Sequence, residues 1–299
     1  MFLDNEECPT CFENTLSVHE NDISGEQEKY CGNCGYRLLY NTKTNVEVSL
    51  DNIVGSGYPG EKEYTKSKRK LHYLFQKAEN NNKDLIVIFS AFPKKGQPPV
   101  YNYIRKLLPV DSNKLFILDE YGPSASYYLG GNRDFSLEDS VISLIKDVCL
   151  ENAINFANVT SMGSSKGGFA SLYFGIKYGF GNIVAAAPQI YMGNFVFGVH
   201  PNVAEYISGG LTESDKEYLN DLLPKVLKKS SHKPKIHLHV GKGDHHYKGH
   251  ILPFIKLLDD KNINYDLDLQ DYQAHDEVGA YFPDYLYSVF KDKLKTVNV

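Results

Sequence analysis

The 299-residue sequence lacks several features, and their absence limits where the protein is expected in the cell and which ligands it is expected to bind. No apolar run approaches the roughly 18 residues that a membrane-spanning helix needs, and the first residues lack the basic and apolar stretch of a secretion signal. Basic residues are not in excess: the sequence has 32 lysines and arginines against 37 aspartates and glutamates, and its formal net charge is −5. We therefore expect a cytoplasmic protein without a membrane span, and the charge gives no electrostatic reason to expect nucleic acid as a ligand.

Cysteine is also scarce, and most of the five cysteines fall into two pairs. Cys8 with Cys11, and Cys31 with Cys34, each have the spacing Cys-x-x-Cys. Two thiolates three positions apart at a tight turn can both reach one tetrahedral zinc ion, and a second pair completes the shell. Two disulfides are the alternative, which the reducing cytoplasm disfavours. The sequence therefore predicts a zinc-ribbon-like domain over residues 1–50, with a structural Zn²⁺ and a surface that could dock a protein partner.

From residue 84 onward, short apolar runs alternate with helical patterns. The run 85–89 is continuous and bounded by polar residues, as expected for a strand buried on both faces of a sheet. The helical stretch from Ser136 has the form of a capping box and places Cys149 on its apolar face, so we expect that cysteine in the core. The alternation predicts an α/β fold with a doubly wound, mostly parallel sheet over residues 60–299, in which 190–233 could form a lid. The predicted strands are 85–89, 115–118, 159–162, 183–187, 236–240 and 265–269.

A Gly-x-Ser-x-Gly motif follows one of these strands. Gly163, Ser165 and Gly167 lie between the run 159–162 and a segment of helical character. A serine between a buried strand and a helix must occupy a tight turn, and the flanking glycines allow a strained backbone and a close crossing there. Such a turn is typical of the nucleophile elbow of α/β-hydrolases. A glycine-rich turn with a chance serine is the alternative interpretation.

A nucleophilic serine needs a base that takes its proton and an acid that orients the base. Asp244 and His275 each lie in the loop just past a predicted strand, as Ser165 lies just past the strand 159–162. The C-terminal ends of parallel strands share one edge of a sheet, so we expect the three side chains to meet there. Their order along the chain is that of α/β-hydrolases. We predict Ser165 as nucleophile, His275 as general base and Asp244 as the orienting carboxylate. The alternative acids are Asp271 and Asp276.

The oxyanion that forms when a serine attacks a carbonyl needs two N–H donors. Lys166 follows the serine directly, and its amide is the first predicted donor. The second is expected from the loop after the strand 85–89, at Ala91 or Phe92. Pro93 has no N–H, which limits the choice.

Histidines near Asp244 offer a metal site as an alternative. His237 and His239 project to one side of a strand, and His245 and His246 follow the aspartate. The arrangement resembles the His-x-His-x-Asp-His motif of metallo-β-lactamase-type hydrolases, but a longer spacer separates the second histidine from the aspartate here. We therefore do not predict a catalytic metal, and no motif indicates an organic cofactor.

The elbow motif at 163–168, read together with 118–123 and 127–130, resembles the XcbB/CpsF family of capsular-polysaccharide biosynthesis proteins. It is also similar to the acetyl-transfer component of the bacterial accessory Sec system. The resemblance implies ester chemistry, either transfer or removal of an acetyl group, on a bacterial surface carbohydrate. Tyr121, Tyr127 and Tyr128 could line a sugar site or pack beneath a loop.

The predicted function is that of a serine esterase or acyltransferase acting on a small-molecule or carbohydrate ester. Hydrolysis and transfer share the same acyl-enzyme, so the sequence does not separate them. A serine peptidase or amidase could use the same triad. A non-catalytic assembly protein for polysaccharide or glycoprotein export could use the fold as a scaffold, but a scaffold has no need of three matched residues.

Overall fold

The computed structural model describes residues 16–21, 26–31, 37–41, 46–48, 53, 55–80, 83–94 and 97–295. The first four ranges form a four-stranded antiparallel sheet in the order β1-β2-β3-β4. Its strands are β1 (Leu16–Asn21), β2 (Glu26–Cys31), β3 (Arg37–Asn41) and β4 (Val46–Val48).

Three of the four cysteines of the predicted zinc shell lie outside the residues that the structure describes. Cys8, Cys11 and Cys34 lie outside the described residues, and Cys31 is the last residue of β2. The zinc ribbon therefore stays a prediction, as do the domain boundaries at 1–50 and 60–299.

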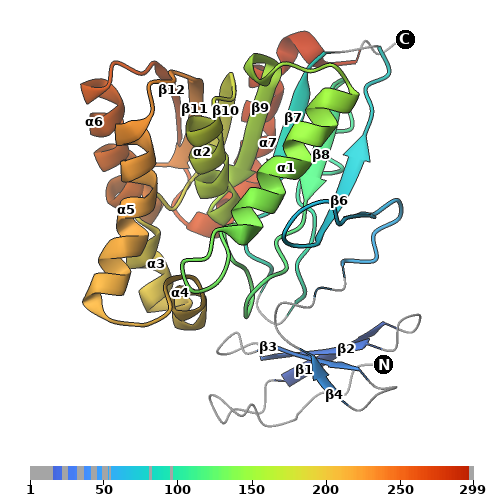
Figure 1. The fold of residues 1–299 in the computed structure, drawn as a ribbon. Coiled ribbons are helices and arrows are strands. Elements are labelled where there is room, and N and C mark those ends of the chain that lie inside the picture. Colours follow the sequence, from blue (N-terminus) through green and yellow to red (C-terminus); the bar gives the residue numbers. More distant parts are fainter. Residues whose placement is uncertain are drawn as a thin grey trace.

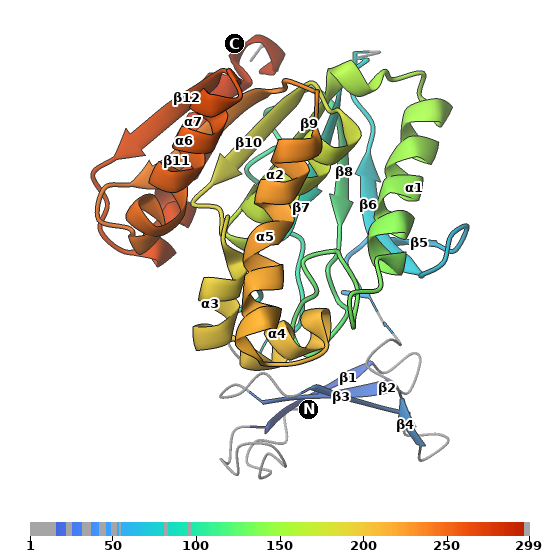
Figure 2. The same cartoon turned by 60° about the vertical axis from the view of Figure 1, so that its left-hand side comes forward.

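The larger sheet has eight strands in the order β12-β11-β10-β9-β7-β8-β6-β5. The neighbours from β12 to β8 run parallel, while β6 and β5 are antiparallel to the strands they join (Figures 1 and 2). The predicted α/β fold with a mostly parallel sheet is confirmed, and each predicted strand is present. The strands are β5 (Lys62–Tyr64), β6 (Leu71–Gln76), β7 (Leu85–Phe89), β8 (Asn113–Ile117), β9 (Val159–Ser164), β10 (Asn182–Ala186), β11 (Lys235–Gly241) and β12 (Tyr265–Gln270).

Helices cover both faces of this sheet. Figure 1 shows α1 and α2 in front of the strands and α7 behind them, and the segment 190–233 contains α3, α4 and α5. No helix among the described residues is long and apolar enough to cross a membrane. The helices are α1 (Ser136–Glu151), α2 (Lys166–Tyr178), α3 (Met192–Val199), α4 (Pro201–Ser208), α5 (Glu213–Lys229), α6 (Leu252–Asp260) and α7 (Val278–Val289), with short turns η1 (Phe156–Asn158), η2 (Tyr247–Ile251), η3 (His275–Glu277) and η4 (Lys291–Lys293).

The core lies between the central strands and these helices. Every residue of β7 is buried, as a strand covered on both faces should be. Cys149 is buried on α1, as predicted, and burial raises the pKa of its thiol to about 11. The capping box predicted at Ser136 is wrong in detail, because Phe135 is the N-cap and the Ser136 hydroxyl donates to Asp134 instead.

Candidate active site

The Gly-x-Ser-x-Gly motif forms the turn from β9 into α2. Ser165 is the N-cap residue of α2 and has φ 55° and ψ −117°, a conformation that non-glycine residues rarely adopt. Strain of this kind costs of the order of 1–3 kcal/mol and persists only where the surrounding structure enforces it. Here the Ser165 amide donates to the Ala186 carbonyl on β10 at 2.8 Å, which anchors the turn to the sheet.

The two flanking glycines allow backbone segments to approach each other closely. A Cβ atom on Gly163 would lie 2.5 Å from the carbonyl carbon of Gly167. A Cβ atom on Gly167 would lie 2.3 Å from the carbonyl oxygen of Phe89, at the end of β7. Both distances are far below van der Waals contact, and the atoms they reach belong to the backbone. Only glycine fits at these positions, which is the requirement that the sequence motif predicted.

Ser165, His275 and Asp244 lie in one chain of hydrogen bonds at the C-terminal edge of the sheet. The Ser165 Oγ atom is 3.0 Å from His275 Nε2, and His275 Nδ1 is 2.9 Å from Asp244 Oδ2. Asp244 follows β11 and His275 begins η3, just past β12. The structure therefore brings together the three side chains that the sequence singled out. In this order the groups can move a proton from the serine to the imidazole while the carboxylate holds the ring.

Asp244 is buried and accepts hydrogen bonds on both carboxylate oxygens. Its Oδ1 atom receives the backbone N–H of His246 at 2.8 Å and lies 3.0 Å from Nδ1 of the same residue. Burial alone would raise the pKa of Asp244, but the hydrogen bonds from His246 and His275 outweigh it and hold the pKa well below its usual range. The carboxylate is therefore ionised whenever the imidazole needs an acceptor.

The other two candidate acids do not join this chain of hydrogen bonds. Asp271 Oδ1 pairs with the ammonium group of Lys242 at 2.5 Å, and the Asp271 side chain is exposed. Asp276 lies in η3 and is exposed as well. The geometry thus favours Asp244 over both alternatives.

The two predicted oxyanion donors differ in availability. Lys166 is the first residue of α2, and the first N–H groups of a helix have no acceptor within the helix. On the opposite loop, the Ala91 amide already donates to Asn102 Oδ1 at 2.7 Å. Phe92 is therefore the better of the two candidates for the second donor.

The Lys166 side chain points into the protein, beneath the turn. Its ammonium group is fully buried and lies 2.6 Å from Asp119 Oδ2 and 4.6 Å from the centre of the Tyr128 ring. Burial lowers the pKa of this lysine, and the ion pair with Asp119 acts in the opposite direction. The pair fixes the side chain of the residue that carries the first predicted donor.

Gln189 is a site residue that the sequence analysis missed. Its Nε2 atom donates to Ser165 Oγ at 2.9 Å, and its Oε1 atom accepts from the Tyr127 hydroxyl. Gln189 is fully buried and lies just past the end of β10. The one signal in the sequence that could have indicated Gln189 was its position just past a predicted strand, because the three candidate triad residues have the same placement.

The three tyrosines suggested for a sugar site are buried instead. Tyr127 and Tyr128 have no exposed surface and Tyr121 has 3%. Tyr121 donates to the Lys70 carbonyl and Tyr128 to the Ile117 carbonyl, both at 2.9 Å. Packing beneath the loop, rather than contact with a sugar, is the role that their burial supports.

Aromatic side chains from the segment 190–233 lie beside the triad. The Phe195 ring of α3 is 5.7 Å from the His246 ring, and His200 stacks on Phe92 at 4.3 Å. These contacts place the start of the segment next to the site. Movement of the segment as a lid stays a prediction.

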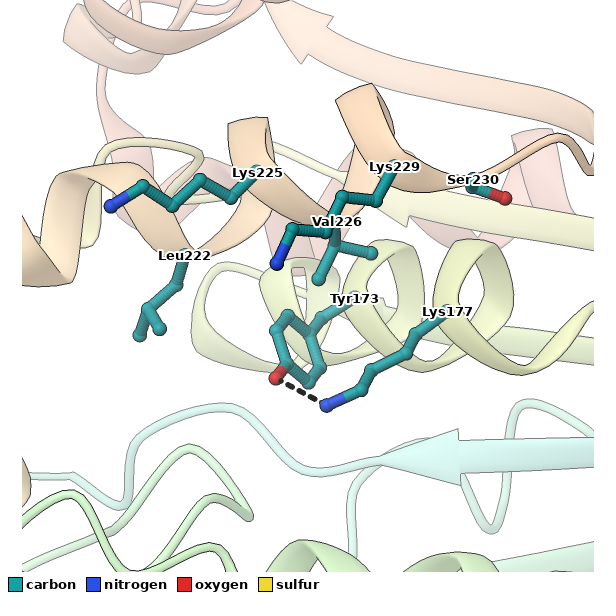
Figure 3. A pocket seen from close by; sticks show the side chains of 7 residues that line it. All are labelled: Tyr173, Lys177, Leu222, Lys225, Val226, Lys229 and Ser230. Carbon is teal, nitrogen blue, oxygen red and sulfur yellow. Dashed lines mark hydrogen bonds between the residues drawn. The ribbon is translucent and has the colours of Figure 1, made fainter.

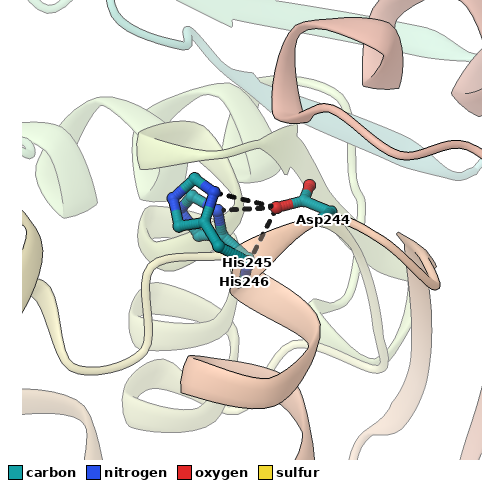
Figure 4. A group of neighbouring side chains, drawn as sticks. All are labelled: Asp244, His245 and His246. Atoms are coloured by element: carbon teal, nitrogen blue, oxygen red, sulfur yellow. Dashed lines mark hydrogen bonds and ion pairs between the residues drawn. The ribbon is translucent and has the colours of Figure 1, made fainter.

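The histidines of the metal alternative divide into two groups. His237 and His239 pair with Asp266 and Asp268 on β12, so they do not gather around Asp244. Asp244, His245 and His246 do have possible ligand atoms within 4.8 Å of one another (Figure 4). A metal ion there would compete with the hydrogen bonds of Asp244, so the geometry favours the triad.

Three histidines around the site have lowered pKa values; His246 and His250 are buried and His200 is half-buried. Burial lowers the pKa of His200 and His246 to about 4 and that of His250 to about 3. In the unfolded chain each pKa returns to about 6.5. The stability that the neutral forms provide is therefore fully present above about pH 6.5 and is lost as the pH falls below it, because the unfolded chain then binds more protons.

We accordingly expect the free energy of unfolding to fall by about 1.4 kcal/mol for each unit of lowered pKa, as an upper limit per histidine. Urea unfolding between about pH 7 and pH 4.5 measures this slope. His200→Phe should show a shallower decline, because one of the three histidines with a lowered pKa is gone. A decline as steep as that of the wild type in this variant would contradict the assignment.

A separate hollow of about 330 Å³ lies between α2 and α5 (Figure 3). Lys177, Lys225 and Lys229 line it, and Lys177 donates to the Tyr173 hydroxyl at 3.0 Å. None of the candidate site residues lines this hollow. It therefore adds nothing to the chemistry at Ser165.

No protein-family model and no curated protein matches the sequence. Among solved structures, the capsule O-acetyltransferase of Neisseria meningitidis serogroup A matches 80% of this chain and 97% of its own, with 25% identity and a TM-score of 0.69. The Glycosylation Associate Protein (Gap123) complex of Streptococcus agalactiae matches 79% of this chain and 48% of its own, with 16% identity and a TM-score of 0.67. FphF, a fluorophosphonate-binding serine hydrolase of Staphylococcus aureus, matches over 79% of this chain and 98% of the FphF chain, with 17% identity and a TM-score of 0.60.

These neighbours match the resemblance that the sequence indicated, both to the α/β-hydrolases and to proteins of capsule biosynthesis and the accessory Sec system. At 16% and 17% identity, the Gap123 complex and FphF show the fold alone. The capsule O-acetyltransferase and the hydrolases share the fold that carries acyl and ester chemistry. The chain is therefore an enzyme of the α/β-hydrolase type.

Proposed function

We propose that the protein is a serine acyltransferase or esterase that moves an O-acetyl group on a bacterial surface or capsular carbohydrate. The observation that carries this proposal is the chain of hydrogen bonds from Asp244 through His275 to Ser165 on a strained turn. The similarity to a capsule O-acetyltransferase supports the acetyl group and the carbohydrate.

The geometry supports a two-step reaction through an acyl-enzyme. Ser165 Oγ attacks the carbonyl carbon of the donor, and its proton passes to His275 Nε2. His275 then gives that proton to the leaving group, which departs and leaves the acyl group on Ser165. In the second step a water or an acceptor hydroxyl gives its proton to His275 and attacks the ester. Ser165 Oγ leaves and recovers the proton.

The backbone N–H groups of Lys166 and Phe92 would donate hydrogen bonds to the carbonyl oxygen as negative charge develops on it. Preorganised N–H donors of this kind each contribute on the order of 100–1,000-fold to the rate. The buried Lys166–Asp119 pair supports this role, because it fixes the first donor without exposing a charge to the substrate. An oxygen ester and a thioester both fit this scheme. One structure of a variant of the Neisseria enzyme is in complex with CoA, so acetyl-CoA belongs among the donors to be tested.

A fluorophosphonate probe tests the proposal directly, because it reacts only with an activated serine. Intact mass should show one adduct on the wild type, none on Ser165→Ala, and a much slower reaction on His275→Ala. Circular dichroism of each variant provides the control for folding. A folded wild type that takes no label would overturn the proposal and favour the assembly-protein alternative.

Gln189 should act as a positioning residue for the nucleophile. Its N–H occupies one lone pair of Ser165 Oγ, and the Tyr127 hydroxyl on Oε1 fixes the orientation of the amide. The serine O–H is thereby directed toward His275. We expect Gln189→Leu, which removes the donor at similar volume, to slow fluorophosphonate labelling by about tenfold, the size of one hydrogen bond of about 1.4 kcal/mol. A labelling rate equal to that of the wild type would contradict this role.

A serine peptidase or amidase remains a second candidate on the same triad, and a panel of peptides and esters separates the two. The zinc ion at Cys8, Cys11, Cys31 and Cys34 also stays a proposal, which rests on the spacing of these residues. We expect one zinc ion per chain by elemental analysis, and its loss in Cys31→Ser. Docking of a protein partner through this region stays a prediction.

A further inference from the structure

The loop that follows β7 carries three consecutive amides, and side chains from other segments occupy two of them. The Ser90 N–H donates to the Tyr128 hydroxyl at 2.7 Å. The Ala91 N–H donates to Asn102 Oδ1, also at 2.7 Å. The Phe92 N–H has no acceptor among the residues that the structure describes. The protein thus ties down the first two amides of the loop and leaves the third without a partner.

This loop lies directly against the nucleophile turn. A Cβ atom on Gly167 would be only 3.1 Å from the Ser90 carbonyl carbon. The Lys166 N–H, at the first position of α2, has no acceptor within the helix. Two backbone segments in contact therefore each carry an unpaired N–H group. An oxyanion hole needs both donors within about 3 Å of one oxygen, so its strength depends on how firmly the two segments are held relative to each other.

Two adjacent side chains link the loop to the turn. Asn102 accepts the Ala91 N–H in the loop, and this bond fixes the peptide unit next to the one that carries the Phe92 N–H. The Tyr103 hydroxyl donates to Ser164 Oγ at 2.7 Å, on the residue immediately before the nucleophile. One short piece of backbone therefore holds both sides of the predicted oxyanion hole.

The backbone of this linking segment is strained. Tyr103 has φ 64°, a conformation that a bulky side chain rarely adopts. Strain of this kind costs of the order of 1–3 kcal/mol and concentrates at functional sites. Consecutive side chains of an extended chain point to opposite sides, so neighbours that must reach two touching segments need a departure from that geometry. The Tyr103 ring packs edge to face on Phe282 of α7, with centroids 5.5 Å apart, and this contact supports the strained conformation.

We propose that Asn102 and Tyr103 are positioning residues of the oxyanion hole. They hold the Phe92 N–H at a fixed distance from the Lys166 N–H. The assignment rests on the proposed function, because it takes these two amides as the donors to the oxyanion that forms at Ser165. Both side chains act through the backbone that they hold, and neither exchanges a proton during the reaction.

Asn102→Leu tests this assignment on the full-length protein, because leucine has a similar volume and no acceptor for the Ala91 N–H. Stopped-flow measurement of the p-nitrophenyl acetate burst gives the acylation rate constant and the dissociation constant of the ester separately. We expect the rate constant to fall by about tenfold to 100-fold, less than the loss of a whole donor costs, and the dissociation constant to stay within about twofold. The affinity for a trifluoromethyl ketone, which forms an oxyanion on the serine, should fall by the same factor as the rate constant.

Tyr103→Phe keeps the ring and removes only the hydroxyl. We expect it to slow acylation by about tenfold, the size of one hydrogen bond of about 1.4 kcal/mol. In both variants the apparent pKa in the pH profile of the acylation rate should not move, because the hydrogen bonds between His275 and Asp244 are untouched.

Asn182→Leu is the matched control. Asn182 is half-buried like Asn102, but it begins β10, at the end of that strand away from Ser165. Its rate constant and its affinity for the ketone should equal those of the wild type. Wild-type acylation in folded Asn102→Leu or in Tyr103→Phe would overturn the assignment, and so would a shifted pKa in the pH profile, which indicates a disturbed triad. In each case the burst of the wild type still supports the acyl-enzyme, whereas its absence would overturn the proposed function itself.

Discussion

Asp244→Asn is expected to lower the rate of acylation of Ser165 by about 10⁴-fold, the size seen when the acid of a serine-protease triad is changed in this way. The asparagine has one oxygen where the aspartate has two. Its oxygen should occupy the Oδ1 position, because two N–H groups of His246 converge there. The amide nitrogen then faces His275 Nδ1 and forces the hydrogen of that ring onto Nε2. An imidazole in this tautomer cannot accept the serine proton.

Stopped-flow measurement of the p-nitrophenol burst gives the acylation rate for this comparison. Asp271→Asn and Asp276→Asn are the matched controls, because both residues are exposed and lie outside the chain of hydrogen bonds. Both should remain within a few-fold of the wild type. Asp244→Asn with nearly normal acylation, or a large loss in either control, would show that another carboxylate orients His275.

Gly167→Ala is expected to destabilise the protein by about 3 kcal/mol or more and to abolish labelling at Ser165. The added methyl group would lie 2.3 Å from the Phe89 carbonyl oxygen, which belongs to the backbone of the central strand β7 and cannot turn aside. Either α2 moves away from β7, or the turn that presents the serine opens. Both changes separate Ser165 from His275.

Gly279→Ala provides the matched control for this substitution. Gly279 lies in the first turn of α7, and a Cβ atom there meets nothing within 4 Å. Alanine should therefore be neutral or stabilising by up to about 1 kcal/mol. Urea unfolding measures both variants. Equal stabilities for Gly167→Ala and Gly279→Ala would show that the crossing of α2 and β7 is looser than the distances indicate.

The placement of the triad followed from the sequence because each of its members is marked by a local pattern. Ser165, Asp244 and His275 each come just past a predicted strand, and parallel strands end at one edge of the sheet. Gly163 and Gly167 are marked by a backbone requirement that no other residue meets. The buried lysine beneath the turn was foreseen only through its amide, because its partner Asp119 is distant in the chain.

The finer features of the site depend on contacts between distant segments, which no local pattern records. Gln189 reaches Ser165 only because β10 lies beside β9. Asn102, which lies 11 residues further along the same connection between β7 and β8, accepts the Ala91 amide, and this contact favours Phe92 between two donors that the sequence left equal.

The sequence by itself determined the fold class, the elbow and which three side chains meet at the edge of the sheet, because strand patterns, glycine geometry and the order of strand ends are local or topological properties. Only the tertiary structure decided that Asp244 serves two imidazoles and that His246 stacks on His275. It also decided that Tyr127 is buried rather than available to a sugar. Burial and ring stacking depend on how side chains pack in three dimensions, and spacing along the chain does not specify that packing.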